Sequence, residues 1–196
     1  MELGRSDRDL PALTVLGLLT LGPRHTYEMH RMMIDYHKDF VTGLPRSMYH
    51  AVERLLRDGH IRVVETVREG GRPERTVYDL TDDGRASLAA RIRRLLAVPD
   101  NDAALFVAAL SFIGCLPVPE AVDALHERLG ALDASRRTVA QSLDATRGVL
   151  PRILLVEAEF TLARVTAEHE FVTGLVADLA SGALDPTEVG DMPSRP

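Results

Sequence analysis

The stretch that decides the fold is Leu44–Ile61, which reads LPRSMYHAVERLLRDGHI. Five apolar residues fall at the 3, 4, 7 and 8 spacing of one helical stripe, namely Met48, Ala51, Val52, Leu55 and Leu56. Polar and charged residues occupy the remaining face, namely Arg46, Tyr49, His50, Glu53, Arg54 and Arg57. Pro45 suits a first helical turn and Gly59 suits a left-handed helix end. The pattern predicts a short two-faced helix, which fits a DNA recognition helix and equally an ordinary amphipathic surface helix.

Two further helices are predicted upstream of this stretch. Residues 12–21 are apolar nearly all round, so we expect this helix to be buried by its own domain and by something more, such as a partner subunit. A second, amphipathic helix is predicted over residues 26–36. Its candidate inward positions are Tyr27, His30, Met33 and Ile34. Residues 1–11 are polar, and we expect them to be loosely ordered.

Downstream of Gly59 the pattern changes from helical to alternating. Residues 61–67 and 76–80 have the alternating, β-branched character of strands, and the sequence EGGRP at residues 69–73 signals a turn. Thr81 then offers an N-cap, with Asp82 and Asp83 in the first turn of the next helix. The inward positions of that helix are Leu88, Ile92, Leu95 and Leu96. The order of three helices, a hairpin and a helix predicts a winged helix-turn-helix, whose third helix can enter a major groove.

The sequence VPDND at residues 98–102 marks a domain boundary, and the chain beyond it reads as helical. Helices are predicted at about residues 103–114, 119–148 and 151–181. The last has more apolar positions than one face can hold, which is typical of a helix packed against its own domain and a second chain. The predicted fold class is therefore mainly α with a small β-hairpin. A winged helix-turn-helix DNA-binding domain (1–98) precedes an all-α dimerisation and effector domain (99–184) and a disordered tail (185–196).

Composition and charge indicate a soluble globular protein. Of 196 residues, 45% are apolar and 27% are charged, and there is neither a membrane-spanning apolar run nor a signal-peptide pattern. The net charge of -6 divides unevenly, because residues 1–98 carry 16 Lys+Arg against 14 Asp+Glu, whereas residues 99–196 carry 7 against 15. The acidity thus belongs to the second half, and a DNA partner for the first half is not excluded. A single cysteine, Cys115, indicates a reducing cytoplasm and favours a buried inert thiol over the alternative of a redox sensor.

Short motifs spread over residues 12–90 resemble the PadR-like family of bacterial transcriptional regulators. The matching pieces are Val15–Leu19, Gly22–His25, Tyr27-Glu28, Ser47–Tyr49, Arg54-Leu55, Gly59, Gly71–Pro73, Tyr78, Leu80-Thr81 and Gly84. Family members usually have Gly where Arg46 stands and Pro where His50 stands, and often Gly where Thr26 stands, so base preference need not follow that of the family. Drug-binding members place a tryptophan at the dimer centre, and this chain has no Trp, so a flat aromatic drug bound in that way is not expected.

Eight residues are candidates for contacts with DNA, some through the resemblance and others through their side-chain chemistry. They are Tyr27, Arg46, Ser47, Tyr49, His50, Arg54, Arg72 and Arg75. Ser47, Tyr49 and His50 match the groove-facing positions, where hydroxyls and a ring can bond phosphates or base edges. Arg46 and Arg54 can reach guanine or a phosphate, and a good bidentate base contact discriminates by roughly 1–3 kcal/mol.

Three of these residues have a plainer interpretation as well. Tyr27 matches a phosphate contact of the family, but it is nearly as well explained as a core tyrosine. Arg72 and Arg75 in the hairpin would meet the DNA backbone or minor groove, or they belong to a solvated turn.

Residue patterns typical of enzymes and metal sites are missing from the sequence. There is no Gly-x-Ser-x-Gly elbow, phosphate-binding glycine loop or His-Glu-x-x-His motif. His25, His30 and His37 are 5 and 7 residues apart, which does not stack ligands on one helical face. We therefore predict no enzyme activity, no cofactor and no metal.

The resemblance implies a cytoplasmic transcriptional regulator, a repressor that binds double-stranded DNA at a palindromic operator. We expect a homodimer formed through the C-terminal helices and the first helix, released by a ligand or partner of unknown identity. The alternative is a winged-helix protein-interaction module without DNA affinity, because a fold alone does not fix a function.

Overall fold

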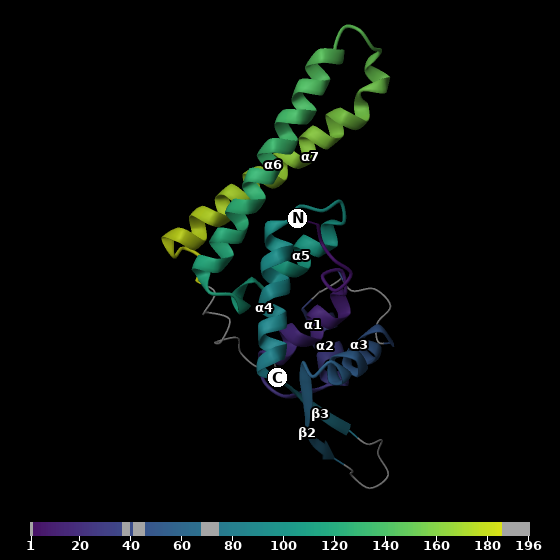
Figure 1. The fold of residues 1–196 in the computed structure, drawn as a ribbon, viewed down its shortest axis with the longest axis vertical. Coiled ribbons are helices and arrows are strands. Elements are labelled where there is room, and N and C mark those ends of the chain that lie inside the picture. The colour runs from purple at the N-terminus through teal and green to yellow at the C-terminus, as the bar shows by residue number, and fades with distance from the viewer. Residues whose placement is uncertain (1, 37–39, 41–45, 68–74, 186–196) are drawn as a thin grey trace. The chain divides into compact units, whose positions relative to one another are not determined.

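The structure is a computed structural model of the 196-residue chain that describes residues 2–36, 40, 46–67 and 75–185. Its elements in chain order are α1 (Leu10–Leu19), β1 (Arg24–His25), α2 (Thr26–Asp35), α3 (Arg46–Arg57), β2 (Ile61–Val67), β3 (Arg75–Leu80), α4 (Asp82–Ala97), α5 (Ala103–Ser111), η1 (Ile113–Cys115), α6 (Val118–Thr146), η2 (Arg152–Leu154) and α7 (Val156–Ser181) (Figure 1). The predicted class, mainly helical with a small antiparallel sheet, is confirmed. No helix in this described part is long and apolar enough to cross a membrane.

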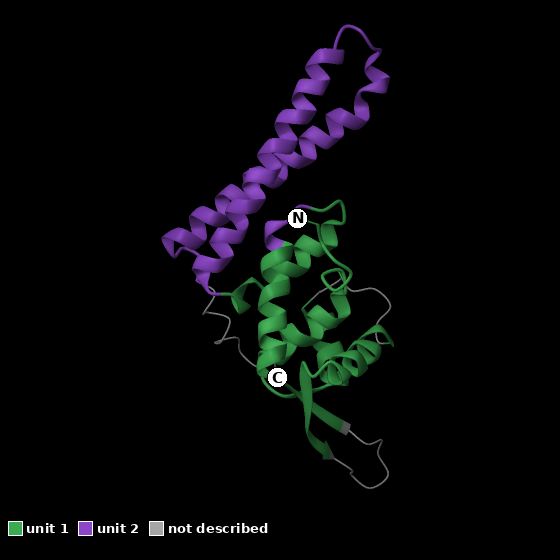
Figure 2. Ribbon diagram, viewed as in Figure 1, with its two compact units in different colours: residues 1–95, 100–116, 186–196 green, residues 96–99, 117–185 purple. Residues whose placement is uncertain are grey.

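The chain forms two compact units (Figure 2). The first contains residues 1–95 and 100–116, and the second contains residues 96–99 and 117–185. Helix α5 thus belongs to the first unit, although the predicted boundary at residue 98 placed it in the second domain. Of the tail predicted to be disordered, residues 186–196 lie outside the described residues.

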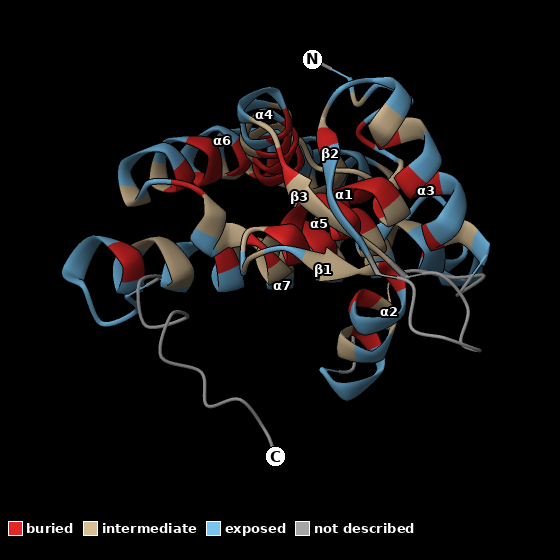
Figure 3. Ribbon diagram, turned by 90° about the horizontal axis from the view of Figure 1, so that it is seen from below, coloured by how far each residue is buried: buried red, intermediate tan, exposed pale blue. Residues whose placement is uncertain are grey.

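Helix α1 is the centre of the first unit. Every residue of α1 except Pro11 is buried, and α3, α5 and β3 all pack against it (Figure 3). Burial on all sides explains why this helix has no polar face. The expected contribution of a partner subunit is not needed, because the first unit covers α1 by itself.

Helix α2 buries a different stripe from the one the sequence suggested. Thr26, Met29 and Met33 are buried, and their i, i+3, i+7 spacing forms a narrow apolar seam. Tyr27 and Ile34, two of the predicted inward positions, are 68% and 58% exposed. The inward assignment of these two residues was therefore wrong.

The wing is a three-stranded antiparallel sheet in the order β1-β3-β2. The predicted hairpin is confirmed, with Ile61 opposite Leu80 at its base and an irregularity between Val63 and Glu65. Strand β1 was not predicted from the sequence; its two residues pair with Tyr78 and Val77 of β3. A two-residue strand is too short to show any alternation in the sequence. The turn at residues 69–73 lies outside the described residues.

The junction between α3 and α4 follows the predicted capping chemistry. Gly59 has φ 74°, a left-handed conformation that ends α3. The Thr81 hydroxyl donates to the Gly59 carbonyl at 2.7 Å and accepts from the Gly84 amide at 3.0 Å. Gly84 lies so close to the chain before β2 that a Cβ there would fall 2.0 Å from the His60 carbonyl oxygen.

The second unit is built on a hairpin of the long helices α6 and α7. Val165, Val172 and Leu179 of α7 are buried at seven-residue intervals, which is the repeat of a coiled-coil seam. Arg128 of α6 is 1% exposed. Its guanidinium donates to Glu168 at 2.6 Å and to the carbonyls of Leu96 and Val98 at 3.3 and 3.0 Å. The buried arginine therefore joins α6 to α7 and to residues 96–98 of the same unit.

We expect Gly84→Ala to destabilise the protein by about 1–3 kcal/mol, the usual penalty for overpacking, because the new Cβ meets a backbone carbonyl that cannot turn aside. Gly130→Ala in α6 is the matched control, because nothing lies within 4 Å of its added Cβ. The control should be neutral or stabilising, since alanine favours helices over glycine by up to about 1 kcal/mol. Chemical and thermal denaturation followed by circular dichroism measure both, and equal stabilities would refute the close approach.

Candidate nucleic-acid interface

The two faces predicted for α3 are present in the structure. Met48, Ala51, Val52 and Leu55 are buried. The exposed residues are Arg46, Tyr49, His50, Glu53 and Arg57. Packing of the apolar face on α1 and α2 leaves the polar face towards solvent (Figure 3). Helix α3 therefore presents a polar surface with an aromatic hydroxyl, an imidazole and two guanidinium groups.

The eight candidate residues differ in how open they are. Tyr49 is 50% exposed, and His50 lies 3.5 Å from Glu53 through its Nδ1 atom. Ser47 is half-buried. Arg54 is engaged with Asp9 at 2.7 Å, and 41% of its side chain remains exposed. Arg46, Tyr49 and His50 are thus open to solvent on α3, whereas Arg54 already holds a carboxylate.

Tyr27 is an exposed residue of α2. Helix α2 packs beside α3, and Tyr27 is 68% exposed. This exposure excludes the alternative of a core tyrosine. The position is open to a large partner such as a phosphate backbone.

The wing carries two candidate residues, Arg72 and Arg75. Arg75 begins β3, where its Cα pairs with that of Val67, and Arg72 lies outside the described residues. Arg62, which the sequence analysis did not single out, is an exposed residue of β2 that reaches Asp79 at 3.0 Å. The sequence does not mark Arg62 as a functional residue, because a single arginine in a strand of alternating polarity commonly faces solvent.

Residues 15–90 match the model of the Transcriptional regulator PadR-like family. The resemblance to the PadR-like family is confirmed. The PadR-like segment, residues 15–90, runs from within α1 to the middle of α4 and contains α2, α3 and the whole sheet.

Individual proteins to which the chain is similar share less than a third of its residues. The Negative transcriptional regulator PadR of Bacillus subtilis (strain 168) is 27% identical over 115 residues, which cover 59% of this chain and 63% of that relative. Bacillus subtilis PadR in its crystal structure with operator DNA is 21% identical in sequence. The match covers 86% of this chain and 98% of the PadR chain, with a TM-score of 0.41. Bacillus subtilis PadR with p-coumaric acid is 18% identical, covers 91% of this chain and 99% of its own, and has a TM-score of 0.38.

The chain that precedes the PadR-like segment is ordered, so the expectation of a loose N-terminus was wrong for residues 4–9. Asp7 is only 4% exposed. It accepts from the Gly4 amide at 2.9 Å and from the guanidinium of Arg94 on α4 at 2.7 and 2.9 Å. Burial alone would raise the pKa of Asp7, but the hydrogen bonds and the positive charge of Arg94 outweigh it and hold this pKa below its usual 3.8.

Neighbouring residues of the N-terminal segment are fastened as well. Arg8 reaches Asp100 at 2.6 Å, and the hydrogen bond from Arg8 lowers the pKa of Asp100. Asp9 caps α1 by accepting from the Ala12 amide at 3.2 Å and pairs with Arg54 through its other oxygen. The segment therefore connects the start of α1 with α3 and α4. Charges of opposite sign alternate in this segment, but their partners are distant in the chain and could not be predicted from the sequence.

The described residues contain no group of three or more His, Cys, Asp or Glu side chains that could hold a metal ion. Cys115 is partly buried, with its sulfur 3.8 Å from the Thr20 hydroxyl. Burial raises the pKa of the Cys115 thiol, which favours the protonated, less reactive form.

We expect Asp7→Asn to destabilise the protein at neutral pH by about 1–3 kcal/mol, because it weakens hydrogen bonds to a charged, mostly buried group. The pKa of Asp7 is lower in the folded state, so its contribution is present above about pH 4 and is lost as the pH falls through the folded value. The difference between Asp7→Asn and wild type should therefore shrink below pH 4. Urea unfolding between pH 3 and 7 measures it, with exposed Asp58→Asn as a charge-matched control. A pH-independent difference would contradict the assigned ion pair.

Proposed function

We propose that this protein is a sequence-specific DNA-binding transcriptional regulator of the cytoplasm, and that it acts as a repressor. The observation that carries the proposal is the open polar first turn of α3 beside a β-wing, within a segment that matches a family of transcriptional regulators. The relative from Bacillus subtilis is named a negative regulator, which favours repression over activation.

The proposed contacts fall into two classes. Tyr27 and Ser47, with the N-terminal end of α3, would bond the phosphate backbone and set the register of the helix. Arg46, Tyr49 and His50 would reach base edges in the major groove. Arg46 and His50 differ from the residues usual in the family, so the preferred operator sequence should be particular to this chain.

The remaining arginines would act more generally. Arg72 and Arg75 would meet the backbone or minor groove from the wing. Arg54 can contribute only if its ion pair with Asp9 opens or is shared, because its guanidinium is already bonded at 2.7 Å. We therefore expect Arg54 to contribute less to the affinity for DNA than the other candidate residues.

A homodimer completes the proposal. Several large apolar side chains of the second unit are exposed in the single chain: Val149, Leu150, Ile153, Leu154, Val156, Phe160 and Phe171. A group of exposed apolar residues of this size is typical of a protein interface. A second copy covering them would place two α3 helices on one duplex, so the operator should be an imperfect palindrome. A ligand or partner that favours one arrangement of the two copies would release the DNA.

Binding to duplex DNA from the region upstream of its own gene tests the function directly. The affinity should fall steeply as salt rises, because each neutralised phosphate contributes about 0.9 to the slope of log K against log salt. Fluorescence anisotropy at several salt concentrations measures this slope. Absence of binding at low salt would contradict DNA recognition and favour a winged-helix protein-interaction module.

The same assay separates backbone contacts from base contacts. Arg72→Ala should weaken binding to all sequences alike and reduce the salt slope by about 1. Arg46→Ala should instead change which sequence is preferred, with a loss of roughly 1–3 kcal/mol at the favoured base. If both variants lose affinity uniformly, the division proposed here is wrong.

Dimerisation is tested by light scattering at micromolar concentration. Wild-type protein should have twice the mass of one chain, and Phe160→Asp should shift the population towards monomer, because a charge would be buried in an apolar interface. Gln141→Glu adds the same charge at an exposed polar position of α6 and should leave the dimer intact. A monomeric wild-type protein would remove the basis for a palindromic operator.

A further inference from the structure

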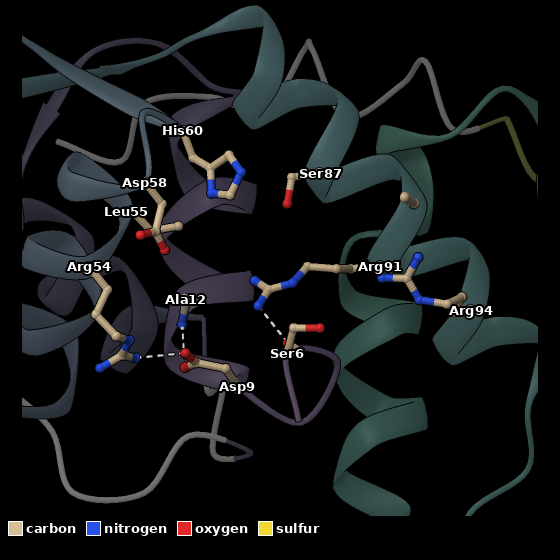
Figure 4. A pocket seen from close by; sticks show the side chains of 11 residues that line it. Ser6, Asp9, Ala12, Arg54, Leu55, Asp58, His60, Ser87, Arg91 and Arg94 are labelled. Carbon is tan, nitrogen blue, oxygen red and sulfur yellow. Dashed lines mark hydrogen bonds and ion pairs between the residues drawn. The ribbon is translucent and has the colours of Figure 1, made fainter. Parts of the chain in front are cut away.

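A cavity of about 210 Å³ with both apolar and charged side chains in its wall lies within the first unit, beside the N-terminal segment, α3 and α4. Its walls include Ser6, Asp9, Arg54, Ser87 and Arg91 (Figure 4). Arg91 extends from α4 towards Ser6, and Arg54 extends from α3 to Asp9. The two guanidinium groups thus approach the N-terminal segment from different helices.

Arg91 is an unusual member of this wall because it is a buried cation. It is 8% exposed, and its guanidinium donates to the carbonyl of Ser6, a neutral acceptor. Burial lowers the pKa of Arg91, while the charges of Asp9 and Asp7 offset this only in part. Within the described part of the chain Arg91 forms no ion pair. Buried charges are normally paired, because desolvation is expensive.

The nearby carboxylates are occupied by other arginines. Asp7 accepts two hydrogen bonds from Arg94, and Asp9 pairs with Arg54 and caps α1. Asp58, the other aspartate of the wall, is exposed to solvent. Arg91 is therefore left without a carboxylate partner among the described residues.

We propose that this cavity binds a small oxyanion, a carboxylate or a phosphate, between Arg91 and Arg54. A guanidinium group carries five N–H donors in a planar fork that matches both anions, and the Arg91 bond to Ser6 leaves most of that fork unused. The Ser87 hydroxyl on the same wall can donate one further bond. A volume of about 210 Å³ is smaller than the roughly 300 Å³ at which pockets for drug-sized ligands begin, so the ligand is a small anion.

Occupancy of this site would act on α3 through Arg54. An anion that bonds Arg54 competes with Asp9, which also caps α1. It also cancels positive charge next to the proposed recognition helix, so it should weaken DNA binding. This consequence rests on the proposed function, whereas binding of the anion does not.

The binding itself is tested on the full-length protein without DNA. Inorganic phosphate and, in a separate arm, succinate are titrated at constant ionic strength while the arginine Nε–Hε signals are followed by NMR. The signals of Arg91 and Arg54 should shift saturably, and that of exposed Arg85 on α4 should not. Arg91→Met should abolish the saturable shift of Arg54. Saturation by phosphate alone, succinate alone or both identifies the preferred anion. Shifts that are linear and equal at all arginines in both arms would overturn the site.

Thermal denaturation gives a second measurement. Phosphate is excluded from protein surfaces and stabilises most proteins, so the informative quantity is the difference between variants. Wild type and Arg85→Met should gain more in Tm from phosphate than Arg91→Met, because a ligand stabilises only the form that binds it. Arg91→Met leaves no carboxylate without its ion-pair partner, because the described part of the chain gives Arg91 none, and circular dichroism before the titration verifies that the variant is folded. Equal gains in all three proteins would overturn the site.

DNA binding then separates this inference from the proposed function. If phosphate binds and weakens the DNA complex of wild type but not of Arg91→Met, the site and its consequence both stand. If phosphate binds while the DNA affinity is unchanged, the coupling through Arg54 is refuted and the site stands. If phosphate fails to bind, the site is refuted whether or not the protein recognises DNA.

Discussion

The fold of the first unit depends on one constraint: α1 is apolar on every side and must be covered on every side. Helices α3 and α5 and strand β3 provide that cover. Because Met48, Ala51, Val52 and Leu55 are committed to this packing, the rotation of α3 about its own axis is fixed. Most polar side chains of α3 are then left exposed, namely Arg46, Tyr49, His50, Glu53 and Arg57. The orientation of the candidate interface is thus a consequence of hydrophobic burial.

Ion pairs add to hydrophobic burial in fixing how the segments of the first unit are positioned. The N-terminal segment brings Asp7 and Asp9 against arginines of α4 and α3. Each of these aspartates also accepts a backbone N–H bond, from Gly4 and Ala12, which offsets part of the desolvation of the carboxylate. Such doubly bonded carboxylates hold their partners in defined positions, unlike solvent-exposed pairs. The N-terminal segment therefore fixes the positions of Arg94 and Arg54, two side chains that the apolar core does not hold.

Sequence patterns predicted those features that repeat or that depend on local chemistry. The apolar stripe of α3, the left-handed Gly59 and the cap at Thr81 each follow from residues adjacent in the chain. The features that were missed depend on distant residues. Strand β1 exists because β3 is there to pair with it, and Asp7 is buried because Arg94 comes to meet it. Tyr27 faces out because Met29 and Met33 fill the only seam on α2.

Arginine count is a poor measure of the affinity of this surface for DNA. The first unit contains arginines that already hold carboxylates, among them Arg8, Arg54, Arg62 and Arg94. A guanidinium in an ion pair must exchange that partner for a phosphate, so it gains less from DNA than one that faces water. The exposed guanidinium of Arg46, at the start of α3, makes no such exchange on the structure described here. On α3, the exposed Arg46 therefore has more to gain from a phosphate than Arg54, which is already bonded to Asp9. Open arginines gathered in one place would let a chain of net charge -6 attract a polyanion, because the local field matters more than the total charge.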